Sequence, residues 1–269
     1  MLRFDLNISI LLKEVPFIER FELASHLGFG AVEFWWPGDE NLAASAQQVR
    51  MHKLNVALIN FDAGDMVVGE RGFLNDVSKR AWFRNHVPAA IEFAAQIGCP
   101  QLNALVGNTI PGESREAQLE CIRENLAWAA DYASSAGLGV VVETLNHFEN
   151  PRYLLTNTPD VLNLLTEVNR ANLKYQYDYY HMQRMEGNLI ATVREHIGRI
   201  GHIQIADSPD RHEPGTGEIN YPHVLAALDT LGYQGYVGLE YNATTTSEAS
   251  FDWLPKEHRR TATVNDLHV

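Results

Sequence analysis

The sequence has only two cysteines among its 269 residues, Cys99 and Cys121, and neither lies in a metal-like or redox-like spacing. We therefore expect two buried thiols in a reducing, cytoplasmic environment. No stretch reaches the roughly 18 apolar residues that a membrane span needs. The N-terminal "MLRFDLNISILLKEVPF" carries charge inside its apolar run and lacks a small-residue cleavage site, so it predicts a first strand and no secretory signal.

Basic residues are scarce as well. The 21 Lys and Arg residues are outnumbered by 34 Asp and Glu residues, which gives a formal net charge of −13. Because a field of this sign repels phosphate backbones and anionic lipid surfaces, we expect neither nucleic acid nor a membrane as a partner. With 45% hydrophobic and 20% charged residues, the composition predicts a globular protein with a sizeable core.

Short apolar, β-branched or aromatic runs recur along the chain and predict strands. Segments with helical periodicity separate them, as in "KRAWFRNHVPAAIEFAAQIG" (79–98), where apolar positions repeat every three or four residues before a glycine. The predicted strands cover residues 2–8, 31–36, 55–60, 101–106, 138–143, 173–178, 201–206 and 235–241.

Alternation of strands and helices implies parallel strands with crossover helices, and eight such units within about 250 residues predict a (β/α)8 TIM barrel. An open doubly wound sheet is the competing α/β fold. It would usually carry G-x-G-x-x-G after its first strand, whereas the loop "SILLKEVPF" contains no glycine. We expect one barrel domain over residues 1–256 and a C-terminal tail over 257–269, because "HRRTATVNDLHV" shows no helical stripe.

Four polar side chains lie at or near the ends of successive predicted strands. Glu143, Asp178, Gln204 and Glu240 are separated by 35, 26 and 36 residues, each close to the length of one βα unit. Active sites of TIM barrels lie at the C-terminal ends of the strands. The spacing therefore predicts that four consecutive strands each aim one oxygen-bearing side chain at the mouth of the barrel.

Three buried carboxylates cannot stay ionised side by side without a cation, because desolvation and like-charge repulsion raise their pKa values. A divalent metal ion resolves this conflict. The all-oxygen set favours Mg²⁺ or Mn²⁺, since a zinc site would more typically contain His or Cys. The alternative is that each acid caps the following helix or pairs with a basic residue, which is the better reading for any one acid alone but not for four in succession.

Longer motifs carry a resemblance that covers residue 1 to about residue 255. The segments "AGDMVVGERG", "LVGNT", "ETLNHFENP", "YDYYHMQRMEGN", "IGHIQIADSPDRHEPGTGEINY" and "GYVGLEY" resemble the hydroxypyruvate isomerase family, including the 2-oxo-tetronate isomerases, within the xylose-isomerase-like TIM barrels. The resemblance implies that Glu143, Asp178, Gln204 and Glu240 are the metal ligands. It also implies that Glu143 and Glu240 are the proton donor and acceptor.

The implied reaction interconverts hydroxypyruvate and tartronate semialdehyde by proton transfer through an enediolate. A four-carbon 2-oxo-tetronate and, with the same site, ketose 3-epimerisation are the alternatives. The loops "LINFDAGD" and "EFWWPGDEN" depart from the family pattern, which leaves the substrate open. His181, Arg211 and Arg71 are the candidates for binding substrate oxygens, since an arginine fork matches a carboxylate. The alternatives are a structural histidine at 181 and a surface charge at 71.

Two other functional classes compete with an isomerase. A metal-dependent phosphodiesterase of the same barrel superfamily would gather several metals with many His ligands and a basic groove, and neither the predicted ligands nor the net charge supports this. A binding protein that kept the metal without catalysis is the second. The expected partner is a small hydroxy-keto acid, and association into a homo-oligomer is left open.

Overall fold

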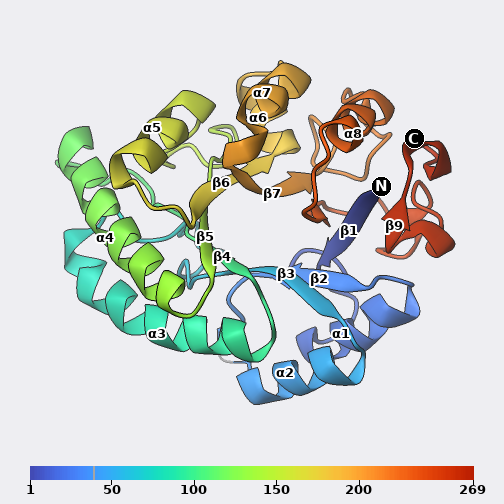
Figure 1. The fold of residues 1–269 in the computed structure, drawn as a ribbon, viewed down its shortest axis with the longest axis horizontal. Coiled ribbons are helices and arrows are strands. Elements are labelled where there is room, and N and C mark those ends of the chain that lie inside the picture. The colour runs from blue at the N-terminus through green and yellow to red at the C-terminus, as the bar shows by residue number, and fades with distance from the viewer. Residues whose placement is uncertain (39) are drawn as a thin grey trace. The chain divides into compact units, whose positions relative to one another are not determined.

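The structure is a computed structural model that describes residues 1–38 and 40–269. Its strands lie in one sheet in the order β2-β3-β4-β5-β6-β7-β8-β1-β9, and β1 also pairs with β2, which closes eight parallel strands into a (β/α)8 TIM barrel (Figure 1). The predicted fold class is therefore confirmed. The strands are β1 (Leu2–Asn7), β2 (Ala31–Phe34), β3 (Asn55–Asn60), β4 (Gln101–Asn103), β5 (Gly139–Glu143), β6 (Leu173–Asp178), β7 (Ile200–Ile205), β8 (Val237–Leu239) and β9 (Thr261–Ala262).

The α-helices follow the strands in alternation, as the periodicity predicted. They are α1 (Phe17–His26), α2 (Leu42–Met51), α3 (Arg80–Gln96), α4 (Arg115–Ser135), α5 (Thr158–Val168), α6 (Tyr179–Met185), α7 (Leu189–His196) and α8 (Tyr221–Thr230). Side chains of Asn41, Ser114, Asn157 and Asn220 accept backbone N–H groups at the starts of α2, α4, α5 and α8. Each such cap contributes about 1 kcal/mol to helix stability. Short 3₁₀ helices lie at η1 (Val77–Lys79), η2 (Ile197–Arg199), η3 (Ala249–Phe251), η4 (Lys256–His258) and η5 (Val264–Asp266).

The chain divides into two compact units. The first unit comprises Met1–Phe34, Asp39–Ala57 and Tyr177–Val269, and the second comprises Trp35–Gly38 and Leu58–Gln176. The boundary of a single domain at residue 256 stays a prediction. No helix among the described residues combines the length and the apolar character that crossing a bilayer requires.

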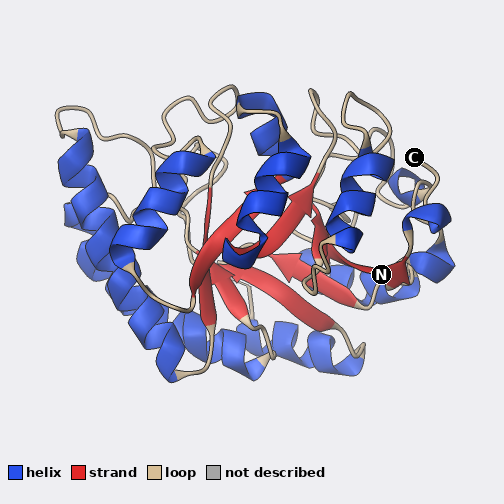
Figure 2. Ribbon diagram, turned by 45° about the horizontal axis from the view of Figure 1, so that its top comes forward, coloured by secondary structure: helices blue, strands red, loops and turns tan. Residues whose placement is uncertain are grey.

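In the first unit, β1 lies between β2 and β8. Phe4 and Leu6 point to one face of β1, and Asp5 and Asn7 point to the other because side chains alternate along a strand. Asn7 is in register with Glu33 of β2, so polar side chains of the two strands are neighbours. Strand β9, within the expected tail, pairs antiparallel with β1, while α7 and α8 lie beside each other (Figures 1 and 2).

In the second unit, β4, β5 and the start of β6 pair in parallel, with Glu143 in register with Gln176. Helices α3, α4 and α5 lie side by side in chain order (Figure 1). Cys121 lies on the buried face of α4, and Cys99 is buried before β4. Both are free thiols, as the sequence predicted.

Candidate active site

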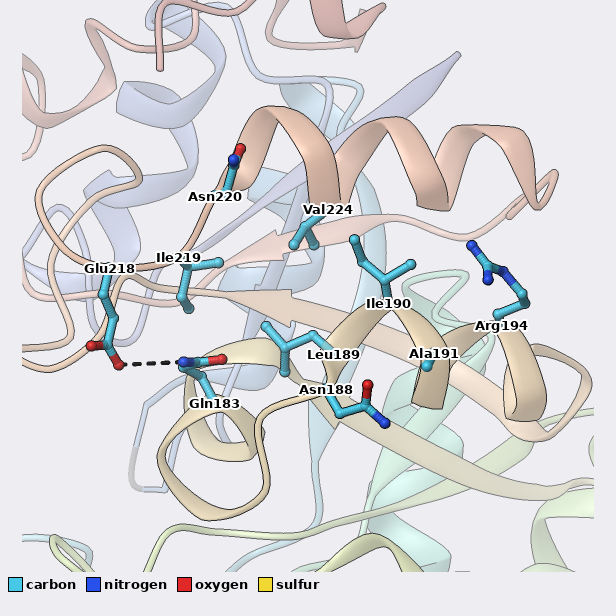
Figure 3. Close-up of a pocket in the computed structure, with 10 residues that line it drawn as sticks. All are labelled: Gln183, Asn188, Leu189, Ile190, Ala191, Arg194, Glu218, Ile219, Asn220 and Val224. Carbon is cyan, nitrogen blue, oxygen red and sulfur yellow. Dashed lines mark hydrogen bonds between the residues drawn. The ribbon is translucent and has the colours of Figure 1, made fainter.

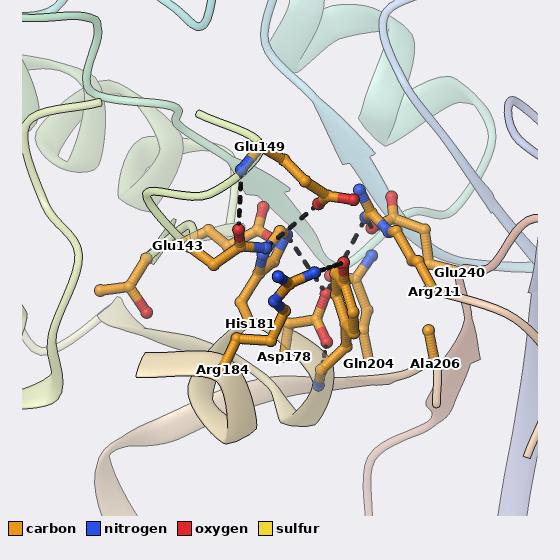
Figure 4. Close-up of polar contacts among 12 residues, drawn as sticks. Glu143, Glu149, Asp178, His181, Arg184, Gln204, Ala206, Arg211 and Glu240 are labelled. Carbon is orange, nitrogen blue, oxygen red and sulfur yellow. Dashed lines mark hydrogen bonds and ion pairs between the residues drawn. The ribbon is translucent and has the colours of Figure 1, made fainter. Parts of the chain in front are cut away.

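Asp178 is the last residue of β6 and also the N-cap of α6. Its Oδ1 accepts the backbone N–H of Tyr180 at 2.8 Å, so the helix-capping alternative holds for one of its two oxygens. Its Oδ2 is buried and has no hydrogen-bond partner among the described residues (Figure 4). A fully buried carboxylate oxygen without a donor is costly, and a cation would satisfy it. The predicted role as a metal ligand therefore fits the local structure.

The protonation of Asp178 reflects this environment. Burial raises the pKa of Asp178 to about 7, although the Arg211 guanidinium lowers it and Glu240 raises it further. Two basic side chains lie near Oδ2, with His181 Nε2 at 3.6 Å and Arg211 Nη2 at 4.0 Å. Because a metal ligand must be deprotonated, a metal ion at this carboxylate competes with a proton.

The raised pKa predicts how the stability of the metal-free protein depends on pH. Folded Asp178 holds its proton more tightly than unfolded Asp178, so its contribution to stability is fully present below about pH 4 and is lost as pH rises through about 7. In a chelator, the wild type should lose on the order of 3 kcal/mol of unfolding free energy relative to Asp178→Asn between about pH 4.5 and about pH 8. Urea unfolding across this range measures the difference. Parallel pH profiles of the two proteins would contradict the assignment.

Glu240 follows β8 and is 5% exposed. Its Oε1 accepts a hydrogen bond from Asn7 Nδ2 at 2.8 Å, and its Oε2 pairs with Arg211 Nη2 at 2.6 Å (Figure 4). The Arg211 guanidinium also lies over the Tyr180 ring, 5.4 Å from its centroid. The structure thus brings four of the predicted residues together in the first unit: Asp178, His181, Arg211 and Glu240.

The loop after β7 places Arg211 in left-handed backbone, with a φ of 61°. Asp207 organises this loop, because its Oδ1 accepts the N–H groups of Ser208 and Ile219 and its Oδ2 accepts that of Gly215. The backbone N–H of Arg211 donates to the carbonyl of Asp207 at 2.9 Å. This role of Asp207 was not predicted from the sequence. The local signal for it is an acid directly after a strand.

Gln204 on β7 joins a buried polar network that the sequence reasoning missed. Its Nε2 donates to Glu33 Oε1 at 2.7 Å. The same oxygen accepts Asn7 Nδ2 at 3.0 Å, and Glu33 Oε2 lies 2.5 Å from His202 Nε2. The only local signal was a charged or imidazole residue inside an apolar run, as in "AVEFWW" and "GHIQIA".

Asp5 completes this network. Ligand atoms of Asp5, Glu33 and His202 lie within 4.8 Å of one another, so the group has the residue types of a small cation site. Burial, and then Glu33 and Glu240, raise the pKa of Asp5 well above its usual range. Burial alone would also raise the pKa of Glu33, but the charge of His202 and the hydrogen bonds from His202 and Gln204 lower it. The pKa values of the two neighbouring acids are therefore shifted in opposite directions.

Glu143 ends β5 in the second unit and is 5% exposed. Its Oε2 accepts Asn103 Nδ2 at 2.8 Å, from the neighbouring β4. Its backbone carbonyl accepts the hydroxyl of Tyr153 at 3.1 Å, and that hydroxyl accepts the N–H of Val106 at 3.0 Å. The carboxylate is thus fixed at the strand end by a neutral amide.

Arg71 also lies in the second unit, in the loop after β3. Its Nε donates to Asn150 Oδ1 at 2.7 Å, and its Nη1 donates to the carbonyls of Met66 and Glu70. These bonds fix the guanidinium to its own loop and to the loop after β5, so it is more than a surface charge. Its contact with a substrate stays a prediction.

Two tryptophans, Trp35 and Trp36, directly follow β2. The Trp36 ring packs edge-on against His86 and Phe93, with centroid distances of 4.6 and 6.0 Å. His86 Nε2 accepts the N–H of Asp62 at 2.9 Å, and burial lowers the pKa of His86. Trp36 therefore packs in an aromatic cluster of the second unit.

A surface cavity of about 370 Å³ lies elsewhere in the first unit, between α6, α7 and α8 (Figure 3). Gln183 Nε2 donates to Glu218 Oε1 across one side of it at 3.3 Å. Its lining residues are Gln183, Asn188, Leu189, Ile190, Ala191, Arg194, Glu218, Ile219, Asn220 and Val224. The predicted metal ligands and substrate-binding residues are not among these, so this cavity is distinct from the candidate active site.

Comparison with known proteins gives likenesses over nearly the whole chain. A family model described as xylose isomerase-like TIM barrel matches residues 21–257. Hydroxypyruvate isomerase of Escherichia coli K12 is 42% identical over 94% of this chain and 98% of its own length. The 2-oxo-tetronate isomerase of Cupriavidus necator is 38% identical with the same coverage of both chains.

Solved structures give the same picture of the fold. A crystal structure described as AP endonuclease, family 2, from Brucella melitensis has a TM-score of 0.91 and 39% identity, and covers 94% of this chain and 98% of its own. A D-psicose 3-epimerase from Clostridium cellulolyticum H10 has a TM-score of 0.74, covers 89% of this chain and 85% of its own, and is only 18% identical. This second likeness concerns the fold alone.

Proposed function

Since this chain belongs to the xylose isomerase-like TIM barrel family, we propose that it interconverts hydroxypyruvate and tartronate semialdehyde with the help of a divalent metal ion. Relatives named hydroxypyruvate isomerase and 2-oxo-tetronate isomerase match nearly its full length. This similarity identifies the chain as an isomerase of the aldose–ketose type. The observation that carries the metal dependence is Asp178 Oδ2, a fully buried carboxylate oxygen with no hydrogen-bond partner among the described residues.

The proposed ligands are Glu143, Asp178, Gln204 and Glu240, each at or near the C-terminal end of its strand. An all-oxygen set of this kind suits Mg²⁺ or Mn²⁺. The local contacts support it, because Asn103 and Asn7 donate to Glu143 and Glu240 as neutral amides. When bound, the ion would polarise the substrate carbonyl and stabilise negative charge that develops on the substrate.

The reaction moves one carbon-bound proton. A carboxylate removes a proton from the hydroxymethyl carbon of hydroxypyruvate, which leaves an enediolate, and a proton is then returned to the neighbouring carbon. The hydroxyl proton passes to the former carbonyl oxygen, so the new carbonyl is an aldehyde. We assign the two carbon proton transfers to Glu143 and Glu240, whose strands β5 and β8 are three strands apart in the order of the sheet. His181 and Arg71 would bind substrate oxygens.

Arg211 is the proposed anchor of the substrate carboxylate. Its Nη2 pairs with Glu240 Oε2 at 2.6 Å. A planar guanidinium matches a carboxylate in two parallel hydrogen bonds, which an acid substrate would use. A charge-assisted bond to a carboxylate contributes about 1.5–3 kcal/mol, so Arg211→Met should raise KM for acid substrates by about 10- to 100-fold. Steady-state kinetics measure this, with the exposed Arg170→Met as the matched control. A KM within about threefold of wild type would remove Arg211 from this role.

A four-carbon 2-oxo-tetronate is the second candidate substrate, because relatives of that name are 36–38% identical to this chain. The deciding experiment incubates the protein with Mn²⁺ and, separately, hydroxypyruvate, 2-oxo-tetronates and ketohexoses, and follows the products by NMR. We expect turnover of hydroxypyruvate. If only 2-oxo-tetronates are turned over, the proposed substrate changes from hydroxypyruvate to a 2-oxo-tetronate. Activity only on ketohexoses, or cleavage of abasic DNA, would overturn the proposal.

A further inference from the structure

We infer that Glu33 is a positioning residue, which fixes the end of the Gln204 amide that faces the proposed metal ion. Its Oε1 accepts the Gln204 Nε2 hydrogen bond at 2.7 Å inside the barrel. The consequence for metal binding rests on the proposed function, whereas the orientation of the amide does not.

A glutamine amide presents an NH₂ donor at one end and a carbonyl acceptor at the other, and rotation by half a turn exchanges them. A carboxylate only accepts, so it selects the NH₂ end of Gln204. The Oε1 of Gln204 is then directed away from Glu33, and an oxygen is the end that a hard cation prefers. An amide that turned its NH₂ group to the metal would repel it.

Asn7 extends the same control to Glu240. Its Nδ2 donates to Glu33 Oε1 at 3.0 Å and to Glu240 Oε1 at 2.8 Å. The orientation of the Asn7 amide is fixed from its other end, where Oδ1 accepts the backbone N–H of Ser9 at 3.0 Å. Glu33 Oε1 therefore accepts a hydrogen bond from one proposed ligand, Gln204, and is linked to a second, Glu240, through the Asn7 amide.

Glu33 is itself held firmly. It is fully buried on β2, and its second oxygen lies 2.5 Å from His202 Nε2. Gly238 of β8 lies against the carboxylate, because a Cβ built at this glycine would come within 2.7 Å of Glu33 Oε2. The carboxylate is thus enclosed by backbone on one side and by a bonded imidazole on another, which is what a positioning group requires.

The sharpest test is the isosteric substitution Glu33→Gln, which keeps the volume and removes the acceptor-only group. Mn²⁺ affinity, measured by calorimetric titration of the folded protein, should fall by about 10- to 100-fold, the size seen when partners of metal ligands are changed. Activity should recover substantially at saturating Mn²⁺. The matched control is Glu14→Gln, which removes a carboxylate that accepts from Ser247 and should leave Mn²⁺ affinity within about threefold of wild type.

A reciprocal exchange separates positioning from simple loss of packing. The single substitution Gln204→Glu places two carboxylates against each other. The double variant, Glu33→Gln with Gln204→Glu, exchanges donor and acceptor and restores one hydrogen bond between the same positions. We expect the double variant to bind Mn²⁺ at least about tenfold more tightly than either single variant. If the double variant binds Mn²⁺ no more tightly than the single variants, the inference is overturned. If Glu33→Gln alone does not fold, the double variant is compared with Gln204→Glu, and the same outcome overturns the inference.

A metal-free readout keeps this test separate from the proposed function. In the chelated protein, the side-chain NH₂ resonance of Gln204, assigned by its loss in Gln204→Glu, should move in Glu33→Gln and stay in place in Glu14→Gln. An unmoved resonance would overturn the role of Glu33. If the resonance moves but the wild type binds no Mn²⁺, the proposed metal fails while the orientation of Gln204 by Glu33 stands.

Discussion

The Glu143→Gln and Glu240→Gln variants should each lose at least about 10³-fold in kcat, since positioned general acids and bases contribute about 10²–10⁴-fold and both residues are also proposed ligands. Glutamine keeps the shape of the side chain but can neither take nor give a proton at pH 7. Each native carboxylate is nearly buried and receives a neutral amide donor, from Asn103 for Glu143 and from Asn7 for Glu240. Neither neighbouring donor can replace the missing proton transfer.

Exchange with D₂O assigns the two roles. A variant that still removes the first proton should exchange deuterium into the hydroxymethyl carbon of hydroxypyruvate without forming product. A variant that has lost this step should show neither exchange nor product. Mn²⁺ titration of both variants separates lost proton transfer from lost metal binding, and Glu14→Gln serves as the control. A variant with unchanged kcat would remove that residue from catalysis.

Removal of divalent metal should reduce turnover by at least about 100-fold, because a Lewis acid contributes several kcal/mol to stabilisation of an enediolate-like charge. Treatment with a chelator, followed by gel filtration and assay, measures the loss. Addition of Mn²⁺ or Mg²⁺ should restore activity, and restoration should need more metal below about pH 7, where the proton on Asp178 competes.

Asp178→Asn provides the matched comparison for metal removal. The substitution keeps an acceptor for the N–H of Tyr180 but removes the buried anionic oxygen. The Mn²⁺ concentration that restores activity should be higher for Asp178→Asn than for the wild type. This concentration should also depend much less on pH in the variant. Full activity of the wild type at a metal content far below one ion per chain would contradict metal dependence.

The strands and long helices were predictable because their signals are local. The predicted strand at 173–178 and the observed β6 coincide, and Asp178 ends both. The alternating aromatic residues of "LKYQYD" indicate a strand, and the acid that follows them marks where it ends. The helix predicted within 79–98 is α3, over Arg80–Gln96. Helix capping and metal binding were treated as alternatives for Asp178. In the structure one carboxylate oxygen, Oδ1, caps α6, while the other, Oδ2, has no hydrogen-bond partner among the described residues and can bind a cation.

The network around Glu33 was not predictable in the same way. Glu33 and Gln204 are 171 positions apart in sequence, and Asn7 and Glu240 are 233 apart. Strand periodicity shows that an acid lies inside an apolar run, but only the closed sheet shows which amide it meets. The pairing of Arg211 with Glu240 has the same origin, since a loop after β7 and the end of β8 meet only in the folded chain.

Gly238 lies in register with both Asp5 of β1 and Gln204 of β7, and the space where its side chain would be is filled by the Glu33 carboxylate. The Glu33 carboxylate on β2 therefore occupies the space that a side chain at position 238 on β8 would need. A side chain at position 238 would meet this carboxylate, so a larger residue there needs a smaller one at position 33. Any redesign of this barrel interior therefore has to change the two positions together.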